Sequence, residues 1–445
     1  KSKKLIKGRK LHLTTPDRIG PPHTGAAMLA LKTEYWRREM LRALGKNEVD
    51  QVMSILHRFN LQAPDDVDPT PLTIIPVTIT YYPLRPGNNI IKRIVSRFFE
   101  VMPARLEEEL EIEGNLLLRN TDINFYFAQP VRPADFLGSF NFINRFLPFF
   151  RSVENPNLLL KHQAKRLIRS VMERIYTNLQ INFDHLFSAV LRNHQGQSIT
   201  RANLYRMIYL ITADIRSKTS RRLHPSAGED MIKLLAEGEY EPARSIEELA
   251  KNRDILDLQP DGTFNIKHIK LNMMHLFHTI RIQNPFMVMA NELEPLTRIM
   301  RLVNIRANQD LDTLQRDTAR ALYAEDVQQY AVDHAGSLNA LSKDRSFNAP
   351  YLLNHPNSRL GVVLTHGFLA SPGETRHLAD YLFQQGYTVY GVRLKGHGTS
   401  PQDMSIATWE QWYASVLRGI ATLRQTCSSI SLVGFSTGGT LSLFA

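Results

Sequence analysis

The sequence has a single cysteine among its 445 residues and no uninterrupted apolar run of the length that crosses a bilayer. One thiol, Cys427, excludes an internal disulfide framework and suits a reducing compartment. A membrane-spanning helix needs about 18 consecutive apolar residues, and no segment reaches that length. Internal repeats and low-complexity tracts are also absent. The sequence therefore predicts a globular chain, which at this length should hold about two or three domains.

Acidic residues are in the minority, with 43 Asp and Glu against 54 Lys and Arg, so the net charge is +11. Such a charge indicates an anionic partner, either nucleic acid or an acidic membrane surface. The basic run at residues 1–10 is expected to be a solvated loop, with phosphate or anionic-lipid binding as the alternative. Because no nucleic-acid-binding motif is present, we expect no nucleic acid and a peripheral position on the cytoplasmic, inner face of a membrane.

The most informative stretch is Ser-Leu-Val-Gly-Phe-Ser-Thr-Gly-Gly at residues 431–439. An apolar strand that runs into G-x-S-x-G and then a helix is the pattern of a nucleophile elbow. The serine, Ser436, then occupies a strained turn, so Gly434 and Gly438 stand where a side chain would be too bulky. The motif also occurs by chance, and a glycine-rich turn that closes a buried strand is the alternative.

The pattern around this motif favours the nucleophile. From about residue 359 onward, apolar strands alternate with helices, which predicts a parallel sheet with right-handed crossovers. The expected strands are 360–365, 387–392 and 430–433, and the expected helices are 374–385 and 405–424. The carboxyl ends of parallel strands share one edge of the sheet, so the loop that begins at His366 should lie near Ser436.

These residues resemble the α/β-hydrolase superfamily, and within it the carboxylesterase and monoacylglycerol-lipase group. The resemblance rests on His366-Gly-Phe368, Arg393-Leu-Lys-Gly-His397-Gly398 and the G-x-S-x-G motif. It implies that Ser436 is the nucleophile and that the backbone N–H groups of Phe368 and Thr437 form the oxyanion hole. It also implies structural roles for His366 and His397, because the catalytic base of the family follows the serine in chain order.

That order places the triad acid and histidine downstream of the serine. Only seven residues follow Gly438, and they contain neither an acid nor a histidine. The sequence also begins with Lys1 and not with methionine. We therefore expect a fragment of a longer protein, cut at both ends.

The N-terminal part shows a different order of elements. A helix is expected at 26–44, a strand at 72–81, a helix at 104–118 and a strand at 123–127. Pro76 lies within the first strand, and because proline cannot donate to a ladder it marks an edge, a bulge or a place where the backbone meets a ligand.

From residue 140 to about 304 the pattern is helical. One expected helix, 266–279, carries His275 and His278, whose spacing would put two imidazoles on one face, as a metal site needs. No further cluster of Cys, Asp or Glu accompanies them, so core or interfacial histidines are favoured and no metal is expected.

The N-terminal order resembles the glycerol-3-phosphate acyltransferases of bacterial membranes and mitochondria. The matching pieces are a helix start at 25–30, a strand at 75–81 and a strand at 125–131. The resemblance implies acyl transfer from an acyl-CoA or acyl-carrier-protein thioester to a glycerol-phosphate hydroxyl, with no bound cofactor, and it places Pro76 and Tyr81 at the acyl acceptor. The H-x-x-x-x-D motif of that family is expected upstream of this sequence. The matching string that starts at His12 follows a lysine-rich loop, so we take it as coincidence.

The predicted fold is thus a multidomain α/β protein. It comprises part of an acyltransferase α/β domain (1–139), a helical region (140–309), a linker (310–350) and the N-terminal half of an α/β-hydrolase domain (351–445). The predicted function is that of a bifunctional lipid enzyme, an acyltransferase fused to a serine esterase or lipase, acting on lipid substrates. The alternative is an acyltransferase whose hydrolase-like domain is inactive and binds a lipid or a partner.

Overall fold

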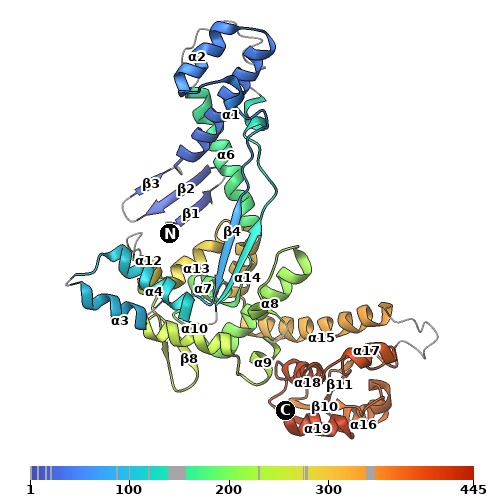
Figure 1. Cartoon of the computed structure of the whole chain (residues 1–445). Coiled ribbons are helices and arrows are strands. Elements are labelled where there is room, and N and C mark those ends of the chain that lie inside the picture. The colour runs from blue at the N-terminus through green and yellow to red at the C-terminus, as the bar shows by residue number, and fades with distance from the viewer. Residues whose placement is uncertain are drawn as a thin grey trace. The chain divides into compact units, whose positions relative to one another are not determined.

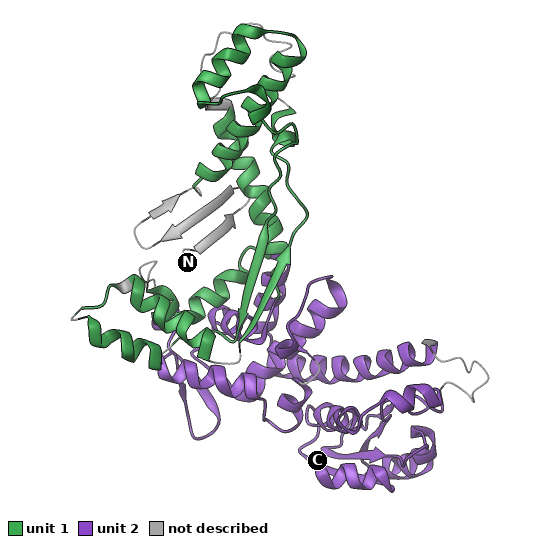
Figure 2. Cartoon of the chain, in the orientation of Figure 1, with its two compact units in different colours: residues 1–180, 274–296 green, residues 181–273, 297–445 purple. Residues whose placement is uncertain are grey.

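The computed structural model describes residues 3–7, 10–15, 18–20, 23–86, 89–99, 101–118, 121–138, 157–228, 231–273, 275, 279–336 and 346–445. The chain forms two compact units (Figure 2). Unit 1 comprises Lys1–Gln180 and Met274–Leu296, and unit 2 comprises Ile181–Met273 and Thr297–Ala445. This division cuts through the helical region expected at 140–309, while the four-part division into domains stays a prediction.

Unit 1 contains two antiparallel β-structures (Figure 1). Strand β4 (Val77–Tyr82) pairs with β5 (Asp122–Phe127). The other sheet has the order β1 (Lys3–Lys7), β2 (Lys10–Thr15), β3 (Arg18–Gly20). The prediction of a loop at residues 1–10 is therefore wrong for the backbone, because 3–7 and 10 pair as strands.

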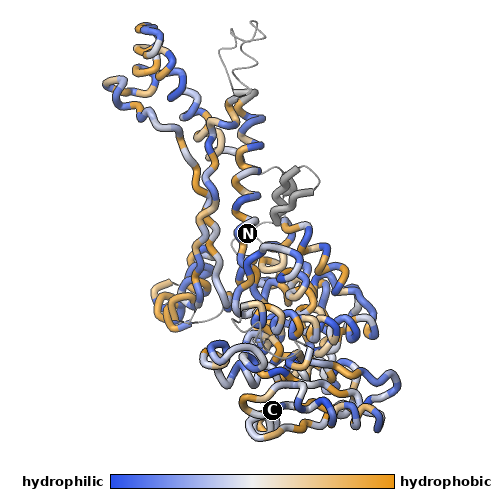
Figure 3. The backbone as a smooth tube through the Cα atoms, turned by 90° about the vertical axis from the view of Figure 1, so that its right-hand side faces the viewer, coloured by the Kyte–Doolittle hydropathy of each residue, from blue (hydrophilic) through white to orange (hydrophobic). Residues whose placement is uncertain are grey.

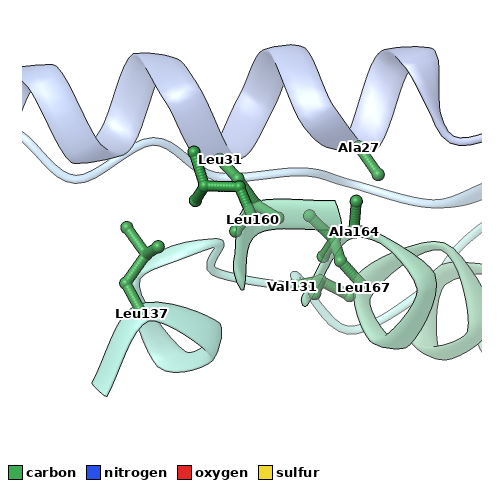
Figure 4. Packing of buried hydrophobic residues seen from close by; sticks show 7 residues of the cluster. All are labelled: Ala27, Leu31, Val131, Leu137, Leu160, Ala164 and Leu167. Carbon is green, nitrogen blue, oxygen red and sulfur yellow. The ribbon is translucent and has the colours of Figure 1, made fainter. Parts of the chain in front are cut away.

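The helices predicted in unit 1 are confirmed. Helix α1 (Gly25–Gly45) packs on α2 (Val49–Phe59) and α6 (Asn157–Thr177), and α4 (Ala104–Leu118) has the expected bounds. Alanine and leucine side chains spaced one turn apart on α1 and α6 form an apolar cluster with the segment after β5 (Figure 4). The buried members are Ala27, Leu31, Val131, Leu137, Leu160, Ala164 and Leu167.

The strand predicted at 72–81 is shorter at its start than expected. Regular pairing begins only at Val77, after Pro76, whose carbonyl accepts a hydrogen bond of 2.9 Å from the Ala128 N–H. Upstream of the proline, Ile74 makes an isolated bridge with Val131. Proline therefore interrupts the ladder, as its missing N–H requires.

Unit 2 begins with helices and a small antiparallel sheet. The helices are α7 (Phe183–Asn193), α8 (Arg201–Lys218), α9 (Met231–Ala236), α10 (Glu241–Asn252), α14 (Thr297–Ala307) and α15 (Leu311–Gly336). The sheet has the order β6 (Ser198–Thr200), β8 (Thr263–Ile266), β7 (Leu256–Leu258).

The helix predicted at 266–279 does not form. Ile266 is the last residue of β8 and pairs with Leu256. The short helix α11 (His268–Leu271) follows and ends at Leu271. His275 lies outside any helix, and His278 lies outside the described residues. Within the described ranges, no group of three His, Cys, Asp or Glu side chains is arranged to hold a metal ion.

The C-terminal part of unit 2 is a four-stranded sheet with the order β12 (Ser429–Gly434), β10 (Leu360–Thr365), β11 (Thr388–Val392), β9 (Tyr351–Leu353). The central strand β10 runs parallel to β11 and β12, which confirms the predicted alternation. An antiparallel edge strand, β9, was not predicted. The single thiol, Cys427, is buried just before β12 with its sulfur against Gly361 of β10.

The strands of this sheet are contacted by the helices α16 (Arg376–Gln384), α18 (Trp409–Leu423) and α19 (Thr437–Phe444). The single helix predicted at 405–424 is instead two, because α17 (Pro401–Ile406) ends before an extended residue, Ala407. A new helix then starts at Thr408, whose N–H donates to Gln411 Oε1 at 3.1 Å.

The segment predicted as a linker, 310–350, contains the long helix α15. This helix packs against α8 on one side and α18 on the other, and it buries Leu314, Leu322 and Tyr330. Most of the segment is therefore an integral part of unit 2.

Apolar and polar residues are interspersed along the described helices, so no helix is hydrophobic throughout (Figure 3). None of the helices in the described ranges combines the length and hydropathy that a bilayer crossing requires.

Candidate active site

Ser436 lies on a sharp turn between β12 and α19. Its φ of 53° and ψ of −119° belong to a region that non-glycine residues rarely adopt. Backbone bonds hold the turn on both sides: the Phe435 N–H donates to Thr365 O at 3.1 Å, and the Gly438 N–H donates to Phe435 O at 2.9 Å. The strain is therefore imposed by the surrounding chain, which is the geometry expected of a nucleophile elbow.

Both flanking glycines are required by close approach of the backbone. A Cβ on Gly434 would lie 2.2 Å from the carbonyl oxygen of Gly438. A Cβ on Gly438 would lie 2.4 Å from the carbonyl oxygens of both Thr365 and His366. No side chain fits at either distance, so the strand, the turn and the first turn of α19 pack backbone against backbone.

The loop after β10 lies against this turn. Thr365 pairs with Gly434 of β12 and with Val392 of β11, so the residues that follow all three strands emerge at one edge of the sheet. Gly367, the second residue of this loop, lies so near to Ser436 that a Cβ added at Gly367 would be 3.5 Å from Ser436 Cβ.

The backbone N–H groups of Phe368 and Thr437 are among those in this region that have no backbone acceptor within the described residues. Thr437 is the first residue of α19, where helix geometry leaves N–H groups unsatisfied by the helix itself. The oxyanion-hole role that the sequence analysis expects for these two N–H groups stays a prediction.

His366 is held by the backbone through both ring nitrogens. Its Nε2 accepts from the Leu394 N–H at 3.2 Å, and its Nδ1 lies 2.8 Å from Gly367 O, so Nδ1 carries the proton. Burial lowers the pKa of His366 to about 4, which keeps the ring neutral at pH 7. With both nitrogens engaged, this ring cannot accept a proton from Ser436.

His397 is similarly enclosed. Its ring lies 5.1 Å from that of His366 and 5.4 Å from that of Trp412, and burial lowers its pKa. The Nδ1 atom lies 3.3 Å from Lys395 O, and Nε2 has no partner among the described residues. Both histidines are parts of the loops that follow β10 and β11.

A cavity of about 630 Å³ opens beside the serine. Trp409 and Trp412 of α18 and Phe444 of α19 line it together with Ser436 and Thr437. Trp409 and Phe444 meet edge to face at 5.8 Å. Aromatic walls of this kind suit an apolar ligand chain. The sequence analysis did not identify these three aromatic residues, although tryptophans three apart at the start of a helix share one face.

The two residues assigned to an acyl acceptor do not lie together. Pro76 is buried before β4, whereas Tyr81 is 40% exposed on the strand and pairs with Ile123. Tyr81 follows Pro76 by five positions of extended chain, which is roughly 17 Å. Their role in acceptor binding remains a prediction.

The lowered pKa of His366 predicts a loss of stability in acid. The unfolded chain takes up a proton near pH 6.5, whereas the folded chain does so only near pH 4. The stabilisation is therefore complete above pH 6.5 and is lost as the pH falls to 4, by about 3 kcal/mol at most. Urea denaturation followed by tryptophan fluorescence at pH 7.5 and pH 4.5 measures this loss.

His366→Asn should flatten the pH dependence between these limits, whereas His57→Asn, which removes an exposed imidazole from α2, should not. An unchanged pH dependence in His366→Asn would contradict the assignment of a buried neutral ring.

A comparison with known families matches this part of the chain. Residues 356–445 match a family described as serine aminopeptidase, S33. Over 88 residues, 20% of the chain, the sequence is 47% identical to a thermostable monoacylglycerol lipase of Bacillus sp. (strain H-257), of which it covers 35%. Over 83 residues, 18% of the chain, it is 35% identical to a carboxylesterase of Bacillus subtilis (strain 168), of which it covers 34%.

A solved structure from work on LipS and LipT, described as two metagenome-derived lipolytic enzymes, shares 37% identity and covers 22% of this chain and 39% of its own. The TM-score of 0.21 is too low to establish a common fold of the two chains. The chain spans about a third of the length of the curated relatives that it matches. The C-terminal part is therefore similar to α/β-hydrolases of the lipase and esterase kind.

Proposed function

Starting from a C-terminal part similar to lipases and esterases, we propose that residues 351–445 carry the nucleophile of a serine carboxylic-ester hydrolase. The observation that carries the proposal is the strained backbone of Ser436, held between a strand and a helix by glycines that admit no side chain. Strain of this kind is maintained where it places a reacting group.

In the proposed reaction, Ser436 Oγ attacks the ester carbonyl carbon while its proton passes to a histidine base. The backbone N–H groups of Phe368 and Thr437 stabilise the oxyanion. The tetrahedral intermediate then expels the alcohol, which takes the proton, and water hydrolyses the acyl-enzyme to the free acid. His366 and His397 are held in loops by backbone contacts, so neither of them is assigned as the base.

The proposed substrate is a lipid ester with one apolar chain, such as a monoacylglycerol. The supporting feature is the cavity lined by Trp409, Trp412 and Phe444 beside the serine. The net charge of +11 favours peripheral binding to an anionic membrane on the cytoplasmic side. Sedimentation with phosphatidylglycerol vesicles, but not with phosphatidylcholine vesicles, is the expected result.

A fluorophosphonate probe tests the hydrolase directly, because it phosphonylates only an activated serine. The intact protein is treated with the probe, digested, and the modified residue is located by mass spectrometry. Modification of Ser436 supports the proposal. A folded protein that is not modified, yet binds lipid, would instead support the alternative of an inactive lipid-binding module.

We propose as a second activity the transfer of an acyl group from acyl-CoA or acyl-carrier protein to a glycerol-phosphate hydroxyl. The supporting observation is that α1, β4, α4 and β5 occur in the predicted order, with β4 beginning five residues later than predicted. Formation of lysophosphatidate from glycerol 3-phosphate and acyl-CoA, retained when Ser436 is replaced, is the expected result. If a protein with active hydrolase formed no lysophosphatidate, the second activity would be rejected.

A further inference from the structure

Helix α15 lies outside the segment that is similar to known hydrolases, yet it is anchored to the hydrolase part by buried polar groups. Asp326 is 2% exposed and accepts a hydrogen bond of 2.6 Å from the hydroxyl of Tyr390 on β11. Arg418 of α18, also buried, lies 3.4 Å from the other oxygen of Asp326 and donates to Gln329 at 2.9 Å. These bonds fix the rotation and position of α15 against β11 and α18.

Two helical turns further along the same face stands Asp333. Its carboxylate lies 2.6 Å from Arg393 Nη1 and 2.7 Å from Lys395 Nζ. The Arg393 side chain is only 2% exposed, and its guanidinium also lies 5.2 Å from the ring centre of Tyr330 on α15. One carboxylate therefore forms ion pairs with two cations in the turn after β11, one of them buried.

This turn holds the residues around the candidate oxyanion hole. Arg393 Nε donates to His397 O at 2.9 Å, and Trp412 Nε1 donates to Lys395 O at 2.9 Å. Between the two cations, the Leu394 N–H donates to His366 Nε2. His366 begins the loop that contains Phe368, and the Phe368 ring in turn contacts those of His397 and Trp412 at 5.9 and 6.1 Å.

From this continuous set of contacts we infer that Asp333 is a positioning residue for the oxyanion loop, supplied to the hydrolase by a helix outside the hydrolase-like segment. It acts by holding Arg393 and Lys395, and through them the Leu394–His366 bond that orients the loop of Phe368. Its part in catalysis rests on the proposed hydrolase function, whereas its effect on the loop does not.

Asp333→Asn tests the inference because it keeps the size of the side chain and removes the charge, which leaves a buried guanidinium without its counterion. In the intact protein, hydrogen exchange of the amides at 366–369 and 393–398 should become at least about tenfold faster. For ester hydrolysis, kcat should fall by about 10- to 100-fold with little change in KM, because an oxyanion donor acts in the transition state.

A matched control exists on the same helix. Asp317 also forms an ion pair of 2.6 Å with an arginine, Arg306, but that arginine belongs to α14. Asp317→Asn should leave both the exchange of the two loops and kcat unchanged. Asp333→Glu, which keeps the charge, should restore most of both.

Each outcome decides one point. Unchanged loop exchange in Asp333→Asn overturns the positioning role, whatever the activity. Faster exchange with unchanged kcat overturns the catalytic part of the inference. Faster exchange in a protein whose wild type has no hydrolase activity upholds the control of the loop and rejects the proposed function.

Discussion

Replacement of Ser436 with alanine is expected to lower kcat/KM for ester hydrolysis by about 10⁴-fold or more and to abolish modification by fluorophosphonate. Neither nearby imidazole can take over the attack, because His366 is bonded to the backbone through both ring nitrogens and the Nε2 of His397 is buried. The residual rate would come from binding and from the oxyanion donors alone.

The same substitution should leave the free energy of unfolding almost unchanged. Ser436 is exposed, and alanine carries the same Cβ into the same strained backbone. Ser431→Ala, on the exposed side of β12, is the matched control and should retain full activity. Activity of Ser436→Ala within tenfold of the wild type would exclude Ser436 as the nucleophile.

Gly434→Ala is expected to destabilise unit 2 by more than about 3 kcal/mol or to prevent the elbow from forming. The added Cβ would meet the Gly438 carbonyl at 2.2 Å, and the contact is with backbone that Thr365 and Phe435 already hold in place. Overpacking usually costs about 1–3 kcal/mol, and here no flexible side chain can move aside. Urea denaturation followed by tryptophan fluorescence, to which Trp409 and Trp412 contribute, measures the loss.

Two other glycines provide a graded comparison. A Cβ on Gly439 would stand 3.2 Å from Gly434 O, so Gly439→Ala should cost less. A Cβ on Gly45, at the end of α1, would meet nothing within 4 Å, so Gly45→Ala should be neutral or slightly stabilising. Equal losses in all three variants would show that conformational entropy, and not close approach, explains the glycines.

The elbow could be predicted from sequence because its determinants are local. An apolar strand, glycines at fixed offsets and a helix start are all encoded within residues 429–444. The same holds for β10 and β11, whose continuous apolar runs reflect burial on both faces of a parallel sheet.

The docking of α15 could not be predicted, because its determinants are distant polar residues. In the sequence, Asp326 and Asp333 look like charged residues on the solvated face of a helix. Their partners Tyr390, Arg393 and Arg418 come close to them only in the folded chain. A buried ion pair and an exposed charge are indistinguishable in sequence when the partner comes from another element.

The helix errors have a different origin. At 266–279 the apolar periodicity is compatible with a helix, but Ile266, the first residue of this range, pairs with β7 as part of β8. At 405–424 the sequence does contain a local signal: Thr408 and Gln411 have the spacing of a capping box, which marks a helix start close to the beginning of the expected helix.

Cys427 gives the hydrolase part a reporter of its own. Because it is the single thiol of the chain, any alkylation of a thiol must be at Cys427. Burial raises the pKa of this thiol. Alkylation therefore waits for the contact between β10 and the start of β12 to open. The rate of its modification thus measures the opening of the region that carries Ser436, separately from any motion in unit 1.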